Sequence, residues 1–178
     1  MKGLDRLAAR EEGEALRKWA WLALLSVFVA APAAAQDKKV RLSFGYAFSK
    51  YLEEGGGNTP LGAYLSIASI GRTVGIEADV AYHRDSEEFF TLNTVTVGLG
   101  PRFELGSAEA KPFFHALGAL RYDRAEGESN TAFGGMTGGG VDIPLGPRAF
   151  FRIGADFQIF FDEGESLKTL RVTAGISF

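Results

Sequence analysis

The chain contains no cysteine. A chain without cysteine has neither disulfide bonds nor a thiolate nucleophile, so backbone pairing and packing must hold its fold. Basic residues are not in excess either, since 19 Lys and Arg stand against 22 Asp and Glu, and nucleic-acid binding is therefore not expected. With only two histidines and no calcium-loop spacing, the sequence predicts no metal site and no cofactor.

A helical period is also missing. After residue 36 no segment of useful length repeats its apolar residues at helical spacing, which predicts an all-β fold. Glycine and phenylalanine are instead abundant, with 23 and 15 copies. This combination is odd for a soluble domain but usual for a thin-walled sheet with aromatic belts.

The first 35 residues are predicted to be a signal peptide. Arg17 and Lys18 precede the apolar stretch 19–31, and Ala33–Ala35 forms a small-residue cleavage site. The stretch is shorter than the roughly 20 residues of a spanning helix, although an uncleaved anchor remains an alternative. Residues 1–16 are long and acidic for the start of a signal peptide, so a start codon assigned too early is also possible. Residues 36–178 then form one domain with 14 Lys and Arg and 18 Asp and Glu.

Eight segments alternate between apolar and small or polar residues, as strands do. Their lengths suit strands that cross a bilayer at a tilt, which takes roughly 9–11 residues. An even number of such strands predicts an antiparallel up-and-down transmembrane β-barrel with both termini on one side. The predicted strands are 39–49, 60–70, 74–83, 89–103, 112–122, 131–143, 148–161 and 170–178.

The connections between these segments differ in kind. Those after the second, fourth and sixth strands are short or modest turns. The loops 50–59, 84–88, 123–130 and 162–167 hold eleven of the 18 acids of the mature domain. Short turns beside the termini and polar loops opposite them are typical of an outer-membrane barrel, so both termini are expected in the periplasm.

The apolar face of each strand is expected to meet lipid. The other face is mostly Gly, Ser, Thr and Ala, which is too sparse in charge for a water-facing surface and suits a narrow lumen. A soluble barrel with its apolar face inward is the alternative. Aromatic residues gather at both ends of the apolar face, as at two membrane interfaces. They are Phe48, Tyr82, Phe89, Tyr122, Phe133 and Phe161 towards the loops, and Phe103, Phe114, Phe151 and Phe178 towards the turns.

Charged residues on the polar face are expected to pair inside the barrel. Unpaired charges in a narrow lumen would be costly, so salt bridges and charge-assisted hydrogen bonds are predicted. A plugged, self-neutralised interior is favoured over an open channel. The predicted members of this lumen network are Arg41, Glu77, Asp79, Arg102, Arg121, Asp142, Arg152, Asp156 and Arg171.

Residues 39–178 as a whole resemble the outer-membrane β-barrel superfamily that includes the OmpA-like transmembrane domain and other small eight-stranded barrels. The stretch GGGVDIPL, residues 138–145, and the strand with Arg152 and Asp156 resemble the penultimate hairpin of these proteins. The chain ends on an aromatic, and its last strand resembles the signal read by the barrel-assembly machinery. The residues of that signal are Leu170, Val172, Ala174, Ile176 and Phe178.

This resemblance implies a monomer in the bacterial outer membrane, with the assembly machinery, outer-membrane lipid and lipopolysaccharide as partners. A peptidoglycan-binding domain after the barrel is not expected, and the loops are short for a dedicated adhesin.

Three functions remain open at this stage. The first is a structural or surface-interaction protein with exposed acidic loops, and the second is a narrow pore for small solutes. The third is a lipid A-modifying enzyme, because some small barrels place a His, a Ser and an acid at the membrane edge. His83 stands near Ser86, Glu87 and Glu88, but no family motif surrounds it, so no catalytic residue is predicted. His115 is expected in the lumen or at a strand end.

Overall fold

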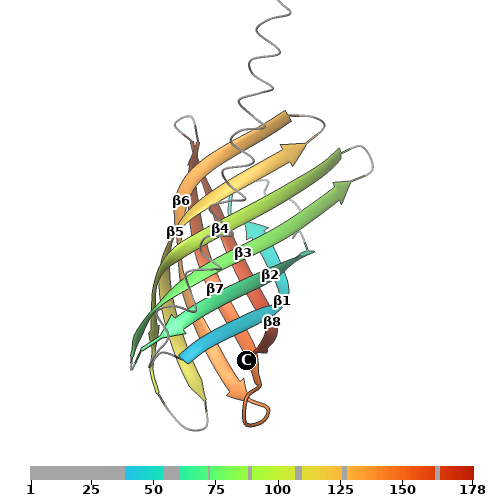
Figure 1. Ribbon diagram of the computed structural model, residues 1–178. Coiled ribbons are helices and arrows are strands. Elements are labelled where there is room, and N and C mark those ends of the chain that lie inside the picture. The colour runs from blue at the N-terminus through green and yellow to red at the C-terminus, as the bar shows by residue number, and fades with distance from the viewer. Residues whose placement is uncertain are drawn as a thin grey trace, which may run out of the picture. The chain divides into compact units, whose positions relative to one another are not determined.

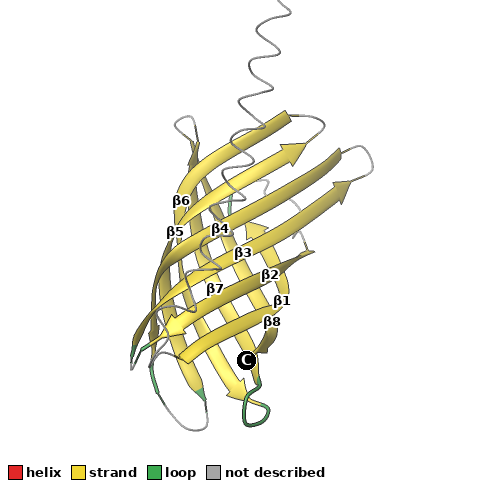
Figure 2. Ribbon diagram, in the orientation of Figure 1, coloured by secondary structure: helices red, strands yellow, loops and turns green. Residues whose placement is uncertain are grey.

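The computed structural model describes residues 39–53, 61–71, 73–87, 90–106, 110–125, 128–162 and 165–178. Within these ranges every regular element is a β-strand (Figure 2). The described part of the chain holds no helix long and apolar enough to cross a membrane. The predicted signal peptide, residues 1–35, lies outside the described residues.

Eight antiparallel strands form a closed barrel in chain order (Figure 1). Each strand pairs with the next, and the first pairs with the last. The predicted eight-stranded up-and-down barrel is therefore confirmed. The strands are β1 (Lys39–Tyr51), β2 (Leu61–Ile70), β3 (Val74–Glu87), β4 (Phe90–Glu104), β5 (Lys111–Ala125), β6 (Glu128–Pro144), β7 (Phe150–Asp162) and β8 (Glu165–Ser177).

The barrel closes where β1 meets β8. Gly45 lies opposite Gly175 in this pairing. At the turn side, the amide of Leu42 donates to the carbonyl of Phe178 at 3.1 Å, and the amide of Phe178 donates back at 2.8 Å. The ring of Phe178 stacks on that of Phe44 with centroids 6.1 Å apart. The last residue is thus bound to the first strand, and the sheet leaves no unpaired edge there.

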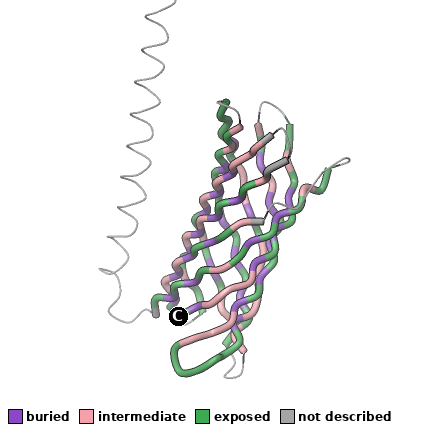
Figure 3. The backbone as a smooth tube through the Cα atoms, turned by 90° about the vertical axis from the view of Figure 1, so that its right-hand side faces the viewer, coloured by how far each residue is buried: buried purple, intermediate pink, exposed green. Residues whose placement is uncertain are grey.

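Apolar side chains point away from the barrel axis. Burial alternates residue by residue along the strands (Figure 3), with the polar face of each strand inward. Of the predicted belt, Phe48, Tyr82, Tyr122, Phe133 and Phe161 are exposed at the loop end, and Phe103, Phe114 and Phe178 at the turn end. Phe151 is half-buried, and Phe89 lies outside the described residues. So much exposed apolar surface is expected against hydrocarbon and not against water.

The strands run further at the loop end than predicted. The predicted loops 84–88, 123–130 and 162–167 fall largely inside strands, because backbone pairing continues to Glu87–Phe90, Ala125–Glu128 and Asp162–Glu165. The prediction ended each strand where the apolar alternation stopped. That alternation reflects lipid contact, whereas the hairpin ladder needs no apolar residue to continue. At the turn end, predicted and observed bounds agree closely.

Part of the interior is apolar. On its loop-side half, inward-facing residues of β5, β6 and β7 pack into a small core of Leu117, Ala119, Ala132, Met136 and Phe160. Space for this core comes from glycines on the same face: a Cβ added at Gly98 would lie 2.1 Å from the Met136 Cε. The interior therefore combines large and small residues, as expected where side chains fill a narrow barrel.

Candidate functional site: the charged interior and the polar mouth

Asp142 of β6 is the most heavily paired carboxylate of the interior. It is fully buried and accepts hydrogen bonds from arginines on three other strands. Arg152 donates from Nε at 2.7 Å and from Nη2 at 2.9 Å, Arg41 from Nη1 at 2.6 Å, and Arg102 from Nη2 at 3.3 Å. A two-pronged Arg–carboxylate contact is among the strongest hydrogen-bonded pairs in proteins.

Two glutamates complete the turn-side half of the network. Glu104 of β4 lies 2.9 Å from Arg41 and 3.0 Å from Arg102. Glu77 of β3 accepts from Arg102 at 3.1 Å and lies 3.6 Å from Arg152. Each of these three arginines therefore faces at least two carboxylates. The buried positive charges are matched across the lumen, which offsets the cost of removing them from water.

His115 of β5 links this half to the middle of the barrel. Its Nδ1 lies 2.9 Å from Glu77, and its Nε2 lies 2.7 Å from Asp156. Arg171 of β8 donates to Asp156 at 2.8 Å and to Asp79 at 2.6 Å. The ion pairs thus form one continuous chain of contacts from Arg41 to Asp79. A doubly protonated imidazole at His115 would balance the five carboxylates of this chain with four arginines.

Aromatic rings cover the guanidinium faces. Phe113 lies under Arg102 and Arg152, with its centroid 3.9 Å and 4.7 Å from their Cζ atoms. Phe150 lies 4.9 Å from Arg41 in the same way. Such cation–π contacts stabilise charge on faces that have no hydrogen-bond donor.

Arg121 stands apart from this network, at the loop end. It donates to Asp123 from Nε at 2.6 Å and to the Tyr51 hydroxyl at 2.8 Å. The Thr94 hydroxyl also donates to Asp123 at 2.5 Å. Eight of the nine predicted lumen residues are therefore joined by ion pairs, whereas Arg121 forms a separate pair with a residue that had been assigned to a loop.

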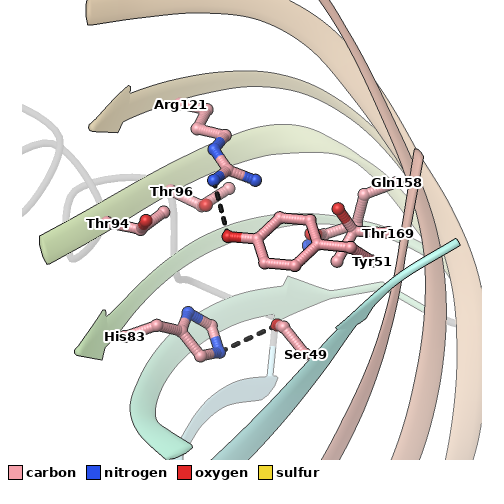
Figure 4. A pocket seen from close by; sticks show the side chains of 8 residues that line it. All are labelled: Ser49, Tyr51, His83, Thr94, Thr96, Arg121, Gln158 and Thr169. Atoms are coloured by element: carbon pink, nitrogen blue, oxygen red, sulfur yellow. Dashed lines mark hydrogen bonds between the residues drawn. The ribbon is translucent and has the colours of Figure 1, made fainter. Parts of the chain in front are cut away.

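The mouth beside Arg121 is polar (Figure 4). His83 of β3 points inward with its Nε2 2.9 Å from the Ser49 Oγ, and Thr169 lies close by with no partner for its hydroxyl. The cavity has a volume of about 10 Å³, room for one water molecule. The residues that line it are Ser49, Tyr51, His83, Thr94, Thr96, Arg121, Gln158 and Thr169.

His83 is a strand residue, as the predicted strand 74–83 implied, and its polar side chain lies inside the barrel wall, 5% exposed. It does not lie at an accessible membrane edge, where the hypothesis of a lipid-modifying enzyme would need it. Glu88 and the side chains of Ser86 and Glu87 fall outside the described part of the chain. Within that part, no group of three or more His, Cys, Asp and Glu residues is arranged to hold a metal.

A second cavity lies deeper in the barrel. Its volume is also about 10 Å³, and Tyr64, Asp79, His115, Asp156 and Arg171 are among the residues around it. The Tyr64 hydroxyl is buried there without a protein partner. A single water would satisfy it and fill the space.

Comparison with known proteins places the chain in a family. Residues 20–178 match the family described as outer membrane protein beta-barrel domain. The chain belongs to this family. Membership of this family implies that the protein lies in the bacterial outer membrane. The closed barrel with its apolar outer face agrees with that location. No curated protein matched the chain.

Solved structures share the fold of this outer-membrane barrel at low identity. Neisserial surface protein A is 12% identical with a TM-score of 0.67, over 78% of this chain and 95% of its own. Ail from Yersinia pestis is 20% identical with a TM-score of 0.56, over 78% and 97% of the two chains. OprG from Pseudomonas aeruginosa is 11% identical with a TM-score of 0.56, over 78% and 93%. At these identities the similarity shows the fold alone.

Two carboxylates of this outer-membrane barrel were missed as interior residues. Glu104 follows the inward-facing Arg102 by two positions, and Asp123 follows Arg121 in the same way. Because side chains two positions apart on a strand point to the same face, the sequence did indicate that both carboxylates face the interior. Both were missed because the strands were predicted to end before them.

The residues of the predicted assembly signal lie on the outward face of β8 and at its end. Leu170, Val172 and Phe178 are exposed, whereas Ala174 and Ile176 are half-buried. Their role as a signal stays a prediction.

Proposed function

We propose that this protein is a non-conducting outer-membrane barrel with a structural or surface-interaction role, carried out by its loop-side hairpins and its contact with lipid. The carrying observation is the continuous chain of ion pairs from Arg41 to Asp79, which crosses the lumen between strands on opposite walls. Cavities of about 10 Å³ beside it admit a water molecule but not a hydrated solute.

We infer further that the loop-side hairpins face the outside of the cell and the termini face the periplasm. The paired ends of β3–β4 and β5–β6 reach beyond the aromatic belt, at the end of the barrel opposite the C-terminus (Figure 1). Longer external hairpins and short periplasmic turns are the usual asymmetry of these barrels. Recognition of the C-terminal strand by the barrel-assembly machinery and a monomeric state belong to the same proposal.

The competing functions gain less support. A pore would need a continuous path past Asp142, which three arginines surround. A lipid-modifying enzyme would need its base where an acyl chain can reach it. His83 instead points into the barrel and its partner Ser49 is buried with it. A lipid in the surrounding bilayer would contact the opposite face of β3.

Conductance in a planar lipid bilayer tests the proposal. Purified, folded protein is expected to give no steady single-channel steps, because the paired side chains leave no water-filled path through the described interior. Insertion is verified independently by recovering protein with heat-modifiable gel mobility from the same vesicles. Reproducible steps of one unit size from the wild type would contradict a non-conducting lumen.

A further inference from the structure

Charged residues at the loop end are sorted by the face of the strand. Beyond the aromatic belt, the described strands carry four basic residues on the outward face. The acidic residues at the same end lie at inward positions: Asp85, Asp123, Glu128, Asp162 and Glu165. At the described strand positions of this end, no acidic residue faces outward. The outward basic residues, here named the basic band, are Lys50, Arg84, Arg124 and Lys168.

Three residues of the basic band follow a belt residue on their own strand, and Lys168 lies two positions from Leu170 towards the loop end. Lys50 lies two positions beyond Phe48, and Arg84 lies two positions beyond Tyr82. Arg124 follows Tyr122 in the same way. Two residues of a tilted strand rise about 5 Å along the membrane normal. Since aromatic side chains mark the edge of the hydrocarbon, the basic groups reach the layer of lipid headgroups directly above it.

The band consists of two pairs. Arg84 and Arg124 both flank Asn93 of β4 in the strand register, which places them roughly 10 Å apart across two strand spacings. Lys50 lies opposite Leu170, so Lys168 is its diagonal neighbour across the β1–β8 seam, roughly 7–8 Å away. Long basic side chains at these separations can approach one anionic group together.

The turn end lacks such a band. On the outward face there, the described strand positions carry no charged residue, and the basic Lys111 of β5 turns inward onto Phe150 at 4.4 Å. If both ends of the barrel were surrounded by the same solvent, their outward faces would not be expected to differ in charge. A membrane whose two leaflets differ in headgroup charge provides one, because basic groups are stabilised only beside anionic headgroups.

We propose that the basic band binds phosphate groups on the headgroups of outer-leaflet lipids, one phosphate at Arg84 and Arg124 and another at Lys50 and Lys168. The inward acids keep these phosphates at the outer wall, since they repel anions from the mouth. This inference rests on the proposed function for its orientation, which puts the hairpins in the outer leaflet.

Titration with lipid A in detergent tests the basic band. Folded protein is mixed with diphosphorylated lipid A, and the bound fraction is measured by native mass spectrometry. Each removed charge is expected to weaken binding about fivefold at low salt, so R84Q/R124Q and K50Q/K168Q each weaken it roughly 25-fold. The control K111Q/R148Q removes two basic residues at the turn end and is expected to change the affinity less than about twofold.

Heat-modifiable gel mobility verifies that each variant is folded, and the charge-preserving K50R/K168R is expected to bind as the wild type does. Equal weakening by the turn-end control would overturn the inference. So would equal binding of dephosphorylated lipid A, or no binding by the wild type. Orientation does not enter this titration. If surface labelling instead placed the hairpins in the periplasm, the proposed function would fail while the measured phosphate affinity stood.

Discussion

Replacing Asp142 with asparagine is expected to lower the free energy of unfolding of the barrel by about 3–5 kcal/mol. Asp142 is fully buried and accepts hydrogen bonds from Arg41, Arg102 and Arg152. Asparagine keeps the shape but removes the negative charge, and its amide group would point hydrogen at the guanidinium donors. Three arginines would then share the remaining carboxylates in a low-dielectric interior, where an uncompensated charge is costly.

Urea unfolding in lipid vesicles, followed by gel mobility without heating, measures this loss. The control is Glu128→Gln, which removes the same charge at an exposed hairpin end and is expected to change stability by less than about 0.5 kcal/mol. In the double variant D142N/R152Q, part of the loss is expected to return because an arginine is removed with its partner. Equal stability of D142N and the wild type would show that the ion pairs do not hold the interior together.

Replacing Gly45 with valine is expected to prevent the barrel from closing. Gly45 lies opposite Gly175 at the β1–β8 seam. A Cβ at Gly45 would lie 2.2 Å from the carbonyl oxygen of Ala174 and 2.4 Å from the Cα of Gly175. Both are backbone atoms, so the two strands themselves would have to separate. The cost should exceed the roughly 1–3 kcal/mol of ordinary overpacking.

Loss of the heat-modifiable folded band after refolding into vesicles is the expected observation for G45V. Gly118→Val is the matched control, because a Cβ there has nothing nearer than 3.9 Å and faces outward. The control should fold as the wild type does. A G45V protein that folds with normal mobility would mean that the seam tolerates a side chain and that the close approach of β1 and β8 is not required.

The fold could be predicted from the sequence because a single pattern determines it, the alternation of apolar and polar side chains every two residues. Along β8, Leu170 and Val172 alternate with Arg171 and Thr173, and that alternation survives wherever a strand has lipid on one side and a lumen on the other. The loop-side ends of the strands could not be read in this way. From Asp123 onwards both faces of the hairpin are polar, while backbone pairing continues to Ala125.

The interior was partly predictable. Parity assigned Arg102, Asp142 and the other charged residues to the inward face, because alternate side chains point to opposite faces. Which of them meet depends on how far each strand is shifted against its neighbours, and a single strand does not carry that information. The position of His115 between Glu77 and Asp156, from three different strands, is such a case, as is the separation of Arg121 from the network.

The account depends most on apolar side chains facing lipid while the opposite face lines a closed interior. Because the chain has no cysteine, single cysteines can be introduced on β8 and spin-labelled without background. In a bilayer, outward positions should collide often with oxygen and rarely with a water-soluble nickel reagent, whereas inward positions should show little collision with either. The outward positions are Leu170, Val172 and Ile176, and the inward ones are Thr169, Thr173 and Ser177. The highest collision rates with oxygen at positions 169, 173 and 177 would contradict the claim that the apolar side chains face lipid. Free access of the nickel reagent to those three positions would contradict the claim that the opposite face lines a closed interior.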